Sequence, residues 1–156
     1  MVGEPVRSGS FRVDRARGLE LLRRFQLPDA TDFLLPWLRL AAASASKRVE
    51  LESLAWGLEL RFHGETIPAA RLADPFDCFF GGPGGEDNAR YPHLVAGLLG
   101  ALRHGPREVT LRSGEAGRRV RLTIDWLGRQ TLLPEAAPGS GTSLRVSWRG
   151  WFTGRL

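Results

Sequence analysis

The spacing of hydrophobic residues changes period along the chain, and each period predicts a type of element. Apolar residues recur at helical spacing over residues 31–46, which predicts a helix there, and a shorter helix is predicted over residues 14–27. From residue 49 to residue 62 apolar and polar residues alternate in two runs, 49–53 and 56–62. Two alternating runs joined by a short turn predict an antiparallel hairpin.

The second half of the chain continues with helical and then alternating patterns. One or two short helices are predicted over residues 67–80, a flexible loop with four glycines over 81–88, and a longer helix over 91–104. Alternating segments then predict three more strands, over residues 107–113, 118–127 and 142–150. We predict a hairpin turn at residues 113–117 and a longer loop over residues 130–141.

The order of these elements predicts the fold class. Two helices, a hairpin, short helices, a glycine-rich loop, a helix and three strands indicate a two-layer α+β sandwich. In that fold the helices pack on one face of a mixed, mostly antiparallel sheet. We expect residues 1–10 to form a flexible leader and residues 11–156 to form a single domain.

The tryptophans are interpreted as packing residues. Trp56 and Trp126 lie on alternating strands, so we expect both in the core. Trp148 and Trp151 lie near the end of the sequence, where we expect them to cover a sheet edge or to contact a partner.

Composition and charge narrow the class of protein only slightly. The 156 residues suit one domain, and 22 basic against 17 acidic residues give a net charge of +5. A basic chain can bind nucleic acid, but its arginines are spread out and only the run at 118–121 is dense. There, alternation directs Arg119 and Arg121 to an outer sheet face, so a nucleic-acid partner is not expected. A single cysteine, Cys78, excludes an internal disulfide; we expect no membrane association and a cytoplasmic location.

Four local motifs stand in a fixed order along these elements. The helix in PWLRLAAASASKRVEL comes first, and FHGETIP follows, with a strand ending at Phe62, a turn at Gly64 and a helix entry at Ile67 and Pro68. The glycine-rich GGPGGEDNARYPHLVAGLLGAL and the strand GSGTSLRV complete the series. This order resembles the GHKL ATPase superfamily, the group of gyrase, the large heat-shock chaperone, sensor histidine kinases and MutL proteins. The resemblance covers about residues 11–149 and implies the Bergerat-like form of the sandwich.

The resemblance also implies a nucleotide site, whose polar residues are missing from this sequence. In the family a helix glutamate activates water, an asparagine holds magnesium, and an aspartate before the glycine binds adenine. The helix positions fall at Pro36 and Leu40, or at Leu38 and Ala42 in another register, and no Glu, Asp, Asn, Gln or His occurs in residues 33–46. Phe62 occupies the place of the aspartate. We therefore expect no catalytic residues, no metal ligands and no ATP hydrolysis by the family mechanism.

The retained matches are structural. The residues that would contact a nucleotide, if binding is retained, are Gly64, Thr66, His93, Gly97, Gly141 and Thr142. Substitute groups near the expected pocket mouth include Glu65 and Asp74 as carboxylates and His93 at a helix start, although each is more simply read as a solvated loop residue.

Two interpretations of function follow. The first is a degenerate GHKL-type module without catalysis that acts as a binding or regulatory domain, with a protein partner and no cofactor. The alternative is a divergent ATP- or ADP-binding protein with weak or no hydrolysis, for which magnesium is doubtful. Nucleic-acid binding, which rests on net charge alone, ranks third.

Overall fold

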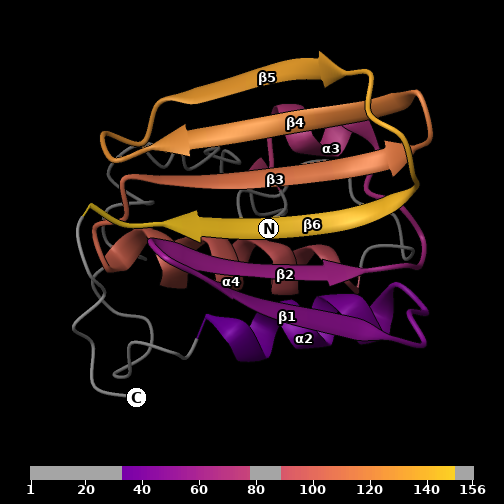
Figure 1. Ribbon diagram of the computed structural model, residues 1–156, viewed down its shortest axis with the longest axis horizontal. Coiled ribbons are helices and arrows are strands. Elements are labelled where there is room, and N and C mark those ends of the chain that lie inside the picture. The colour runs from indigo at the N-terminus through magenta and orange to yellow at the C-terminus, as the bar shows by residue number, and fades with distance from the viewer. Residues whose placement is uncertain (1–32, 78–88, 150–156) are drawn as a thin grey trace, which may run out of the picture.

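The computed structural model describes residues 33–77 and 89–149, which form a sheet with helices on one of its faces (Figure 1). The helices are α2 (Leu34–Ala43), α3 (Ala69–Ala73) and α4 (Tyr91–Arg103). The strands are β1 (Val49–Leu54), β2 (Gly57–Phe62), β3 (Glu108–Glu115), β4 (Arg118–Asp125), β5 (Gln130–Glu135) and β6 (Gly141–Ser147). The α+β class is therefore confirmed. The predictions for residues 1–10, 14–27, Cys78, residues 81–88 and Trp151 lie outside the described residues.

The six strands form one sheet in the order β1-β2-β6-β3-β4-β5. Each of the neighbouring pairs is antiparallel, so the mixed sheet that we expected is wrong for the described strands. The predicted hairpin is confirmed, with Val49 opposite Phe62. The last strand, β6, lies between β2 and β3 and joins the two hairpins into one sheet.

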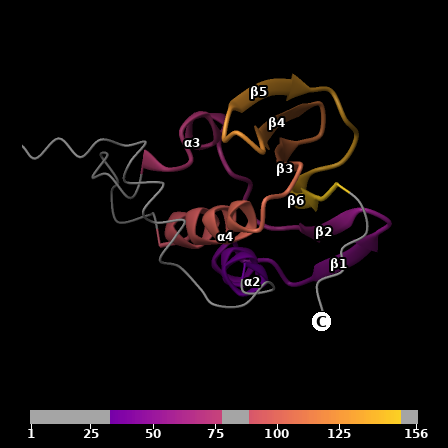
Figure 2. The same cartoon turned by 90° about the vertical axis from the view of Figure 1, so that its left-hand side faces the viewer.

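Helix α2 carries a buried apolar stripe that packs mainly against helix α4. Phe33, Trp37 and Leu40 are buried at helical spacing, and the ring centroids of Phe33 and Trp37 are 5.0 Å apart in an edge-to-face contact. Pro36 lies in the first turn, as expected, where its missing N–H costs no helical hydrogen bond. Side by side with α2, helix α4 completes the layer (Figure 2).

The stretch predicted as a loop over residues 130–141 contains strand β5 over its first half, so that prediction is wrong there. β5 pairs with β4, and Pro134 lies opposite Val120. A proline argues against a central strand, but β5 is an edge strand, where a missing N–H can face solvent. Only residues 136–140 connect β5 to β6.

The placement of Trp56 and Trp126 in the core is also wrong. Their exposed fractions are 49% and 58%, because both lie at turns between strands and not within a strand. Trp148 is half-buried: its backbone N–H donates to the Trp56 carbonyl at 2.8 Å, and its ring centroid lies 6.4 Å from that of Phe33. Trp148 therefore joins the end of β6 to the β1–β2 turn.

The two faces of the sheet differ in character. The face under the helices carries the core residues of the strands, among them Leu60, Phe62, Val109, Leu111, Leu122, Ile124, Leu144 and Val146. The opposite face carries charged and hydroxyl side chains. Arg119 and Arg121 lie on this open face while Val120 and Leu122 point to the core side, as the alternation predicts. Within the described ranges, no helix has both the length and the apolar character to cross a membrane.

Candidate functional site

The turn after β2 is packed against the end of helix α2. A Cβ atom on Gly64 would lie 2.2 Å from the Ser44 carbonyl oxygen, so only glycine fits there. The next residue, Glu65, donates its backbone N–H to the same carbonyl at 2.8 Å. The close approach of the turn to α2 therefore explains why residue 64 is a glycine.

Arg90 holds the same turn from the start of helix α4. Its guanidinium donates to the carbonyl oxygens of Glu65 at 3.1 Å and Thr66 at 3.2 Å, and lies 3.3 Å from the Glu65 carboxylate. His93 lies in the first turn of α4, where its backbone N–H donates to the Arg90 carbonyl. Glu65, a candidate substitute carboxylate, is therefore already paired with an arginine.

Gly97 on α4 faces Trp37 on α2. A Cβ atom at Gly97 would lie 2.0 Å from the Trp37 Cδ1 atom, and the exposed fraction of Trp37 is 0%. The glycine therefore lets the indole lie flat against the α4 backbone. Family glycines allow a nucleotide to approach, whereas here the space beside Gly97 holds a protein ring.

A short chain of hydrogen bonds connects the segment after the Gly64 turn to strands β3 and β6. The Ile67 backbone N–H donates to the Ser113 hydroxyl at 2.7 Å, and the Ser113 and Thr142 hydroxyl oxygens are 2.8 Å apart. All three residues are buried. Thr142, which the resemblance would assign to a nucleotide, is thus bonded within the protein.

Replacement of Ser113 by alanine tests this chain of bonds. We expect the free energy of unfolding to fall by about 1–3 kcal/mol, because the Ile67 N–H and the Thr142 hydroxyl would both lose a buried partner. Urea denaturation followed by far-UV circular dichroism measures the change. Ser147→Ala, on a half-buried hydroxyl near the end of β6, is the control and is expected to change it by less than about 0.5 kcal/mol. Equal effects from both substitutions would contradict the assignment.

The inner face of α2 distinguishes the two registers considered for the missing catalytic residues. Pro36 and Leu40 are buried, whereas Leu38 and Ala42 are exposed. The positions that point into the interior are therefore a proline and a leucine. Around them the interior is filled by apolar side chains, including Trp37, Phe62, Ile67, Leu94 and Leu98.

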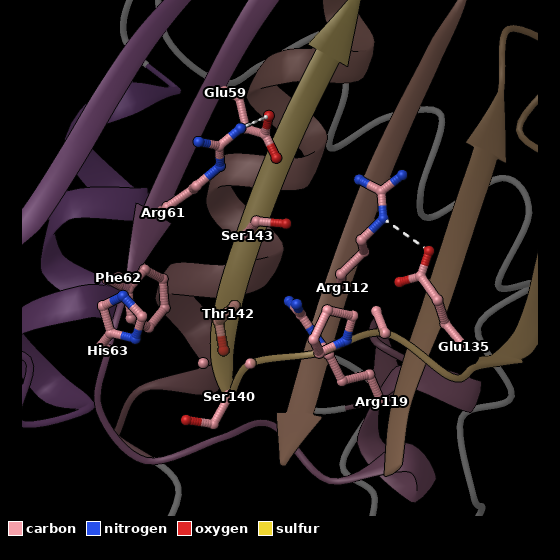
Figure 3. Close-up of a pocket in the computed structure, with 14 residues that line it drawn as sticks. Glu59, Arg61, Phe62, His63, Arg112, Arg119, Glu135, Ser140, Thr142 and Ser143 are labelled. Atoms are coloured by element: carbon pink, nitrogen blue, oxygen red, sulfur yellow. Dashed lines mark hydrogen bonds and ion pairs between the residues drawn. The ribbon is translucent and has the colours of Figure 1, made fainter. Parts of the chain in front are cut away.

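A cavity of about 460 Å³ lies on the open face of the sheet, opposite the helices (Figure 3). Its walls come from β2, β3, β4, β6, the end of β5 and the loop after β5. The lining residues are Glu59, Arg61, Phe62, His63, Arg112, Arg119, Glu135, Ala137, Pro138, Gly139, Ser140, Gly141, Thr142 and Ser143. Of the six residues predicted to contact a nucleotide, the structure brings Gly141 and Thr142 to this cavity. Gly64, Thr66, His93 and Gly97 are not among its lining residues.

Charged side chains in the cavity are mostly paired. The Arg61 guanidinium lies 2.7 Å from the Glu59 carboxylate and 3.0 Å from that of Glu52, and the hydrogen bond to Glu59 is the main cause that raises the pKa of Arg61 above its ordinary value. Arg112 donates to the Glu135 carboxylate at 3.2 Å. The guanidinium groups of Arg61 and Arg112 each keep further N–H groups that can donate hydrogen bonds to a ligand.

Sequence reasoning missed this cavity. Arg61, Arg112 and Ser143 lie far apart in the sequence, and only the strand order brings them together. The available signal was alternation, since each of the three lies between two buried residues of its strand. Alternation assigns the face correctly, but it does not give the register between strands.

Two further findings concern metal binding and similarity to known proteins. In the described part of the chain, no three His, Cys, Asp or Glu side chains are grouped so as to hold a metal ion. No protein-family model matches the sequence, and no curated protein matches it either.

Proposed function

We propose that this protein is a degenerate GHKL-type module, Bergerat-like in fold, that binds a partner without ATP hydrolysis. One observation carries the proposal: the indole of Trp37 lies fully buried against Gly97, between the two long helices. The resemblance places the nucleotide against the inner face of α2. A nucleotide there would have to displace this ring and the side chains packed around it.

The buried polar groups support the same interpretation. Thr142 is bonded to Ser113, and Phe62, with 1% of its surface exposed, stands where an adenine-binding carboxylate would be needed. An apolar inner face on α2 offers no oxygen ligand for magnesium and no base for water. We propose a protein partner in the cytoplasm for the module; the exposed Trp56 and Trp126 are side chains of the type enriched at interfaces.

The proposal is tested by separating the adenosine part of ATP from its phosphates. Thermal unfolding is measured with millimolar Mg-ATP, Mg-ADP and inorganic triphosphate at equal ionic strength, together with phosphate release from ATP. We expect no turnover, and we expect ATP to raise the Tm no more than triphosphate does, because the family cavity is filled by core side chains. Ligand that binds the folded state stabilises it by RT ln(1 + [L]/Kd).

A larger stabilisation by ATP than by triphosphate would instead support the divergent ATP- or ADP-binding protein. Phosphate release that disappears in Gly64→Trp, a change that blocks the turn against Ser44, would refute the absence of catalysis. The matched control is Ala116→Trp at the exposed hairpin turn between β3 and β4, where the residue already carries a Cβ atom and its φ is not positive.

A further inference from the structure

The hollow on the open face arises at one row of cross-strand neighbours in which two adjacent positions are glycines. Across β6, β3 and β4 this row places Gly141 opposite Gly114 and Gly114 opposite Arg119, and Arg119 lies opposite Glu135 on β5. A Cβ atom on Gly141 would lie 2.8 Å from the Phe62 carbonyl oxygen, and its φ is +116°, so glycine is required there. The two bare positions leave a depression beside the long Arg119 side chain.

The neighbouring row places a serine between two arginines. Ser143 on β6 lies opposite Arg61 on β2 and opposite Arg112 on β3. Directly opposed side chains have Cβ atoms about 5 Å apart, so the two guanidinium groups flank the hydroxyl (Figure 3). Ser143 lines the cavity with only 6% of its surface exposed, and its hydroxyl makes no hydrogen bond to another described residue. A nearly buried hydroxyl without a protein partner, facing a cavity, is a ready contact for a ligand.

Arg119 supplies the cation that is not neutralised. Arg61 and Arg112 each pair with a carboxylate, but within the described residues no carboxylate lies within 4 Å of the Arg119 guanidinium. Its Nε is buried and has no hydrogen-bond partner in the described protein. A charge held in this way next to a cavity attracts an anion more strongly than one on an open surface.

We propose that this cleft binds a small molecule through one oxyanion group, a phosphate or a carboxylate, held by Arg119, Arg112 and the Ser143 hydroxyl. The proposal goes beyond the function proposed above, because it assigns a ligand to the face of the sheet opposite the helices and not to the inner face of α2, although Gly141 and Thr142 also line this cleft. Arginine can donate two parallel hydrogen bonds to a phosphate and equally to a carboxylate. The proposal therefore specifies an oxyanion, which the two groups have in common. Ser140 and His63, at one end of the cleft, are positioned to contact the rest of the molecule (Figure 3).

The shape and charge of the cleft favour a small ligand over a nucleic-acid strand. Its volume of about 460 Å³ lies within the range of small-molecule sites, roughly 300–1,000 Å³. Two carboxylates, Glu59 and Glu135, line the same cavity and would repel a continuous phosphate backbone. One oxyanion near Arg119 avoids Glu59, which is bonded to Arg61, and the charge of Glu135 opposite Arg119 is offset by Arg112 and Arg121.

The test measures anion binding by the purified full chain. Inorganic phosphate and succinate are titrated separately by isothermal titration calorimetry and by thermal unfolding, at an ionic strength held constant with sodium chloride. We expect saturable binding of at least one of the two anions, and the pair identifies whether phosphate or carboxylate is preferred. In Arg119→Gln the affinity is expected to fall about tenfold or more, because a charge-assisted hydrogen bond is lost.

Two further variants keep the test decisive. Arg118→Gln makes the same charge change one residue away, at an exposed position directed to the other face, and is expected to leave the affinity within about twofold. Ser143→Leu fills the cleft from an outward-facing position and is expected to abolish binding; it replaces Arg119→Gln if that variant does not fold. Circular dichroism and the Tm without ligand establish that each variant is folded.

The proposal is overturned by three results. The first is that neither phosphate nor succinate binds saturably. The second is that Arg118→Gln and Arg119→Gln lower the affinity for the anion equally. The third is that the small anions do not bind while the protein binds DNA, and Arg119→Gln leaves that DNA binding intact. Failure here is distinguishable from failure of the non-catalytic function. An adenine-dependent stabilisation by ATP that persists in Arg119→Gln contradicts only the latter, whereas absence of phosphate and succinate binding contradicts only the cleft.

Discussion

Replacing Trp37 by alanine is expected to lower the free energy of unfolding by about 3–5 kcal/mol, the largest effect of any single substitution considered for this chain. Trp37 has 0% of its surface exposed and contacts both Phe33 and Gly97. Its removal leaves a void between α2 and α4 that the surrounding helices cannot fully close. The indole Nε1 lacks a hydrogen-bond partner in the described protein, which offsets a part of this loss.

The measurement is urea denaturation of Trp37→Ala beside Leu38→Ala. Leu38 is the next residue of the same helix, but its exposed fraction is 44%, so its truncation is expected to cost less than about 1 kcal/mol. Similar losses in the two variants would show that the interior between the helices is not packed around Trp37. Such a result would also remove the observation that carries the proposed function.

Substituting Gly97 by alanine is expected to destabilise the protein by about 1–3 kcal/mol, although alanine is the better helix former. The added Cβ atom would lie 2.0 Å from the Trp37 Cδ1 atom and 2.2 Å from its Nε1 atom. The ring is fully buried and has no room to shift, so overpacking outweighs the gain in helix propensity of about 1 kcal/mol.

The sign of this effect should reverse when the ring is absent. In a Trp37→Ala background, Gly97→Ala is expected to raise the free energy of unfolding by up to about 1 kcal/mol, because only the helix-propensity gain remains. A double-mutant cycle measured by denaturation isolates the coupling between the two positions. Additive effects would mean that the indole does not lie against Gly97.

The sequence predicted the elements well where a single period dominates a segment. Helix α2, the β1–β2 hairpin and helix α4 lie where the apolar spacing placed them, because α2, β2 and α4 each bury one face against the same core and the exposed strand β1 pairs with β2. β5 was missed because Pro134 contradicts a central strand and is tolerated only at an edge. Whether a strand is an edge depends on the sheet order, which local patterns do not contain.

The same limit applies to the side chains at turns and in the cleft. Trp56 and Trp126 were assigned to the core because the alternating runs include them, but each lies at a turn one residue outside its strand, and turns lie at the surface. In the cleft, Ser143 meets Arg61 and Arg112 only because β6 lies between β2 and β3. The absence of acidic residues in 33–46, in contrast, follows from the sequence itself. It holds whichever register is chosen for the helix, because the residue type is missing from the whole segment.

The sealed interior beside Leu40 makes a metal ligand difficult to introduce on helix α2. Leu40 has 0% of its surface exposed, so an asparagine introduced there would bury an amide among apolar neighbours. An amide without a hydrogen-bond partner costs about 1–3 kcal/mol in a protein interior. Each ligand introduced on this face of α2 would therefore destabilise the fold before a metal site was complete, so packing alone can keep the face apolar over evolutionary time.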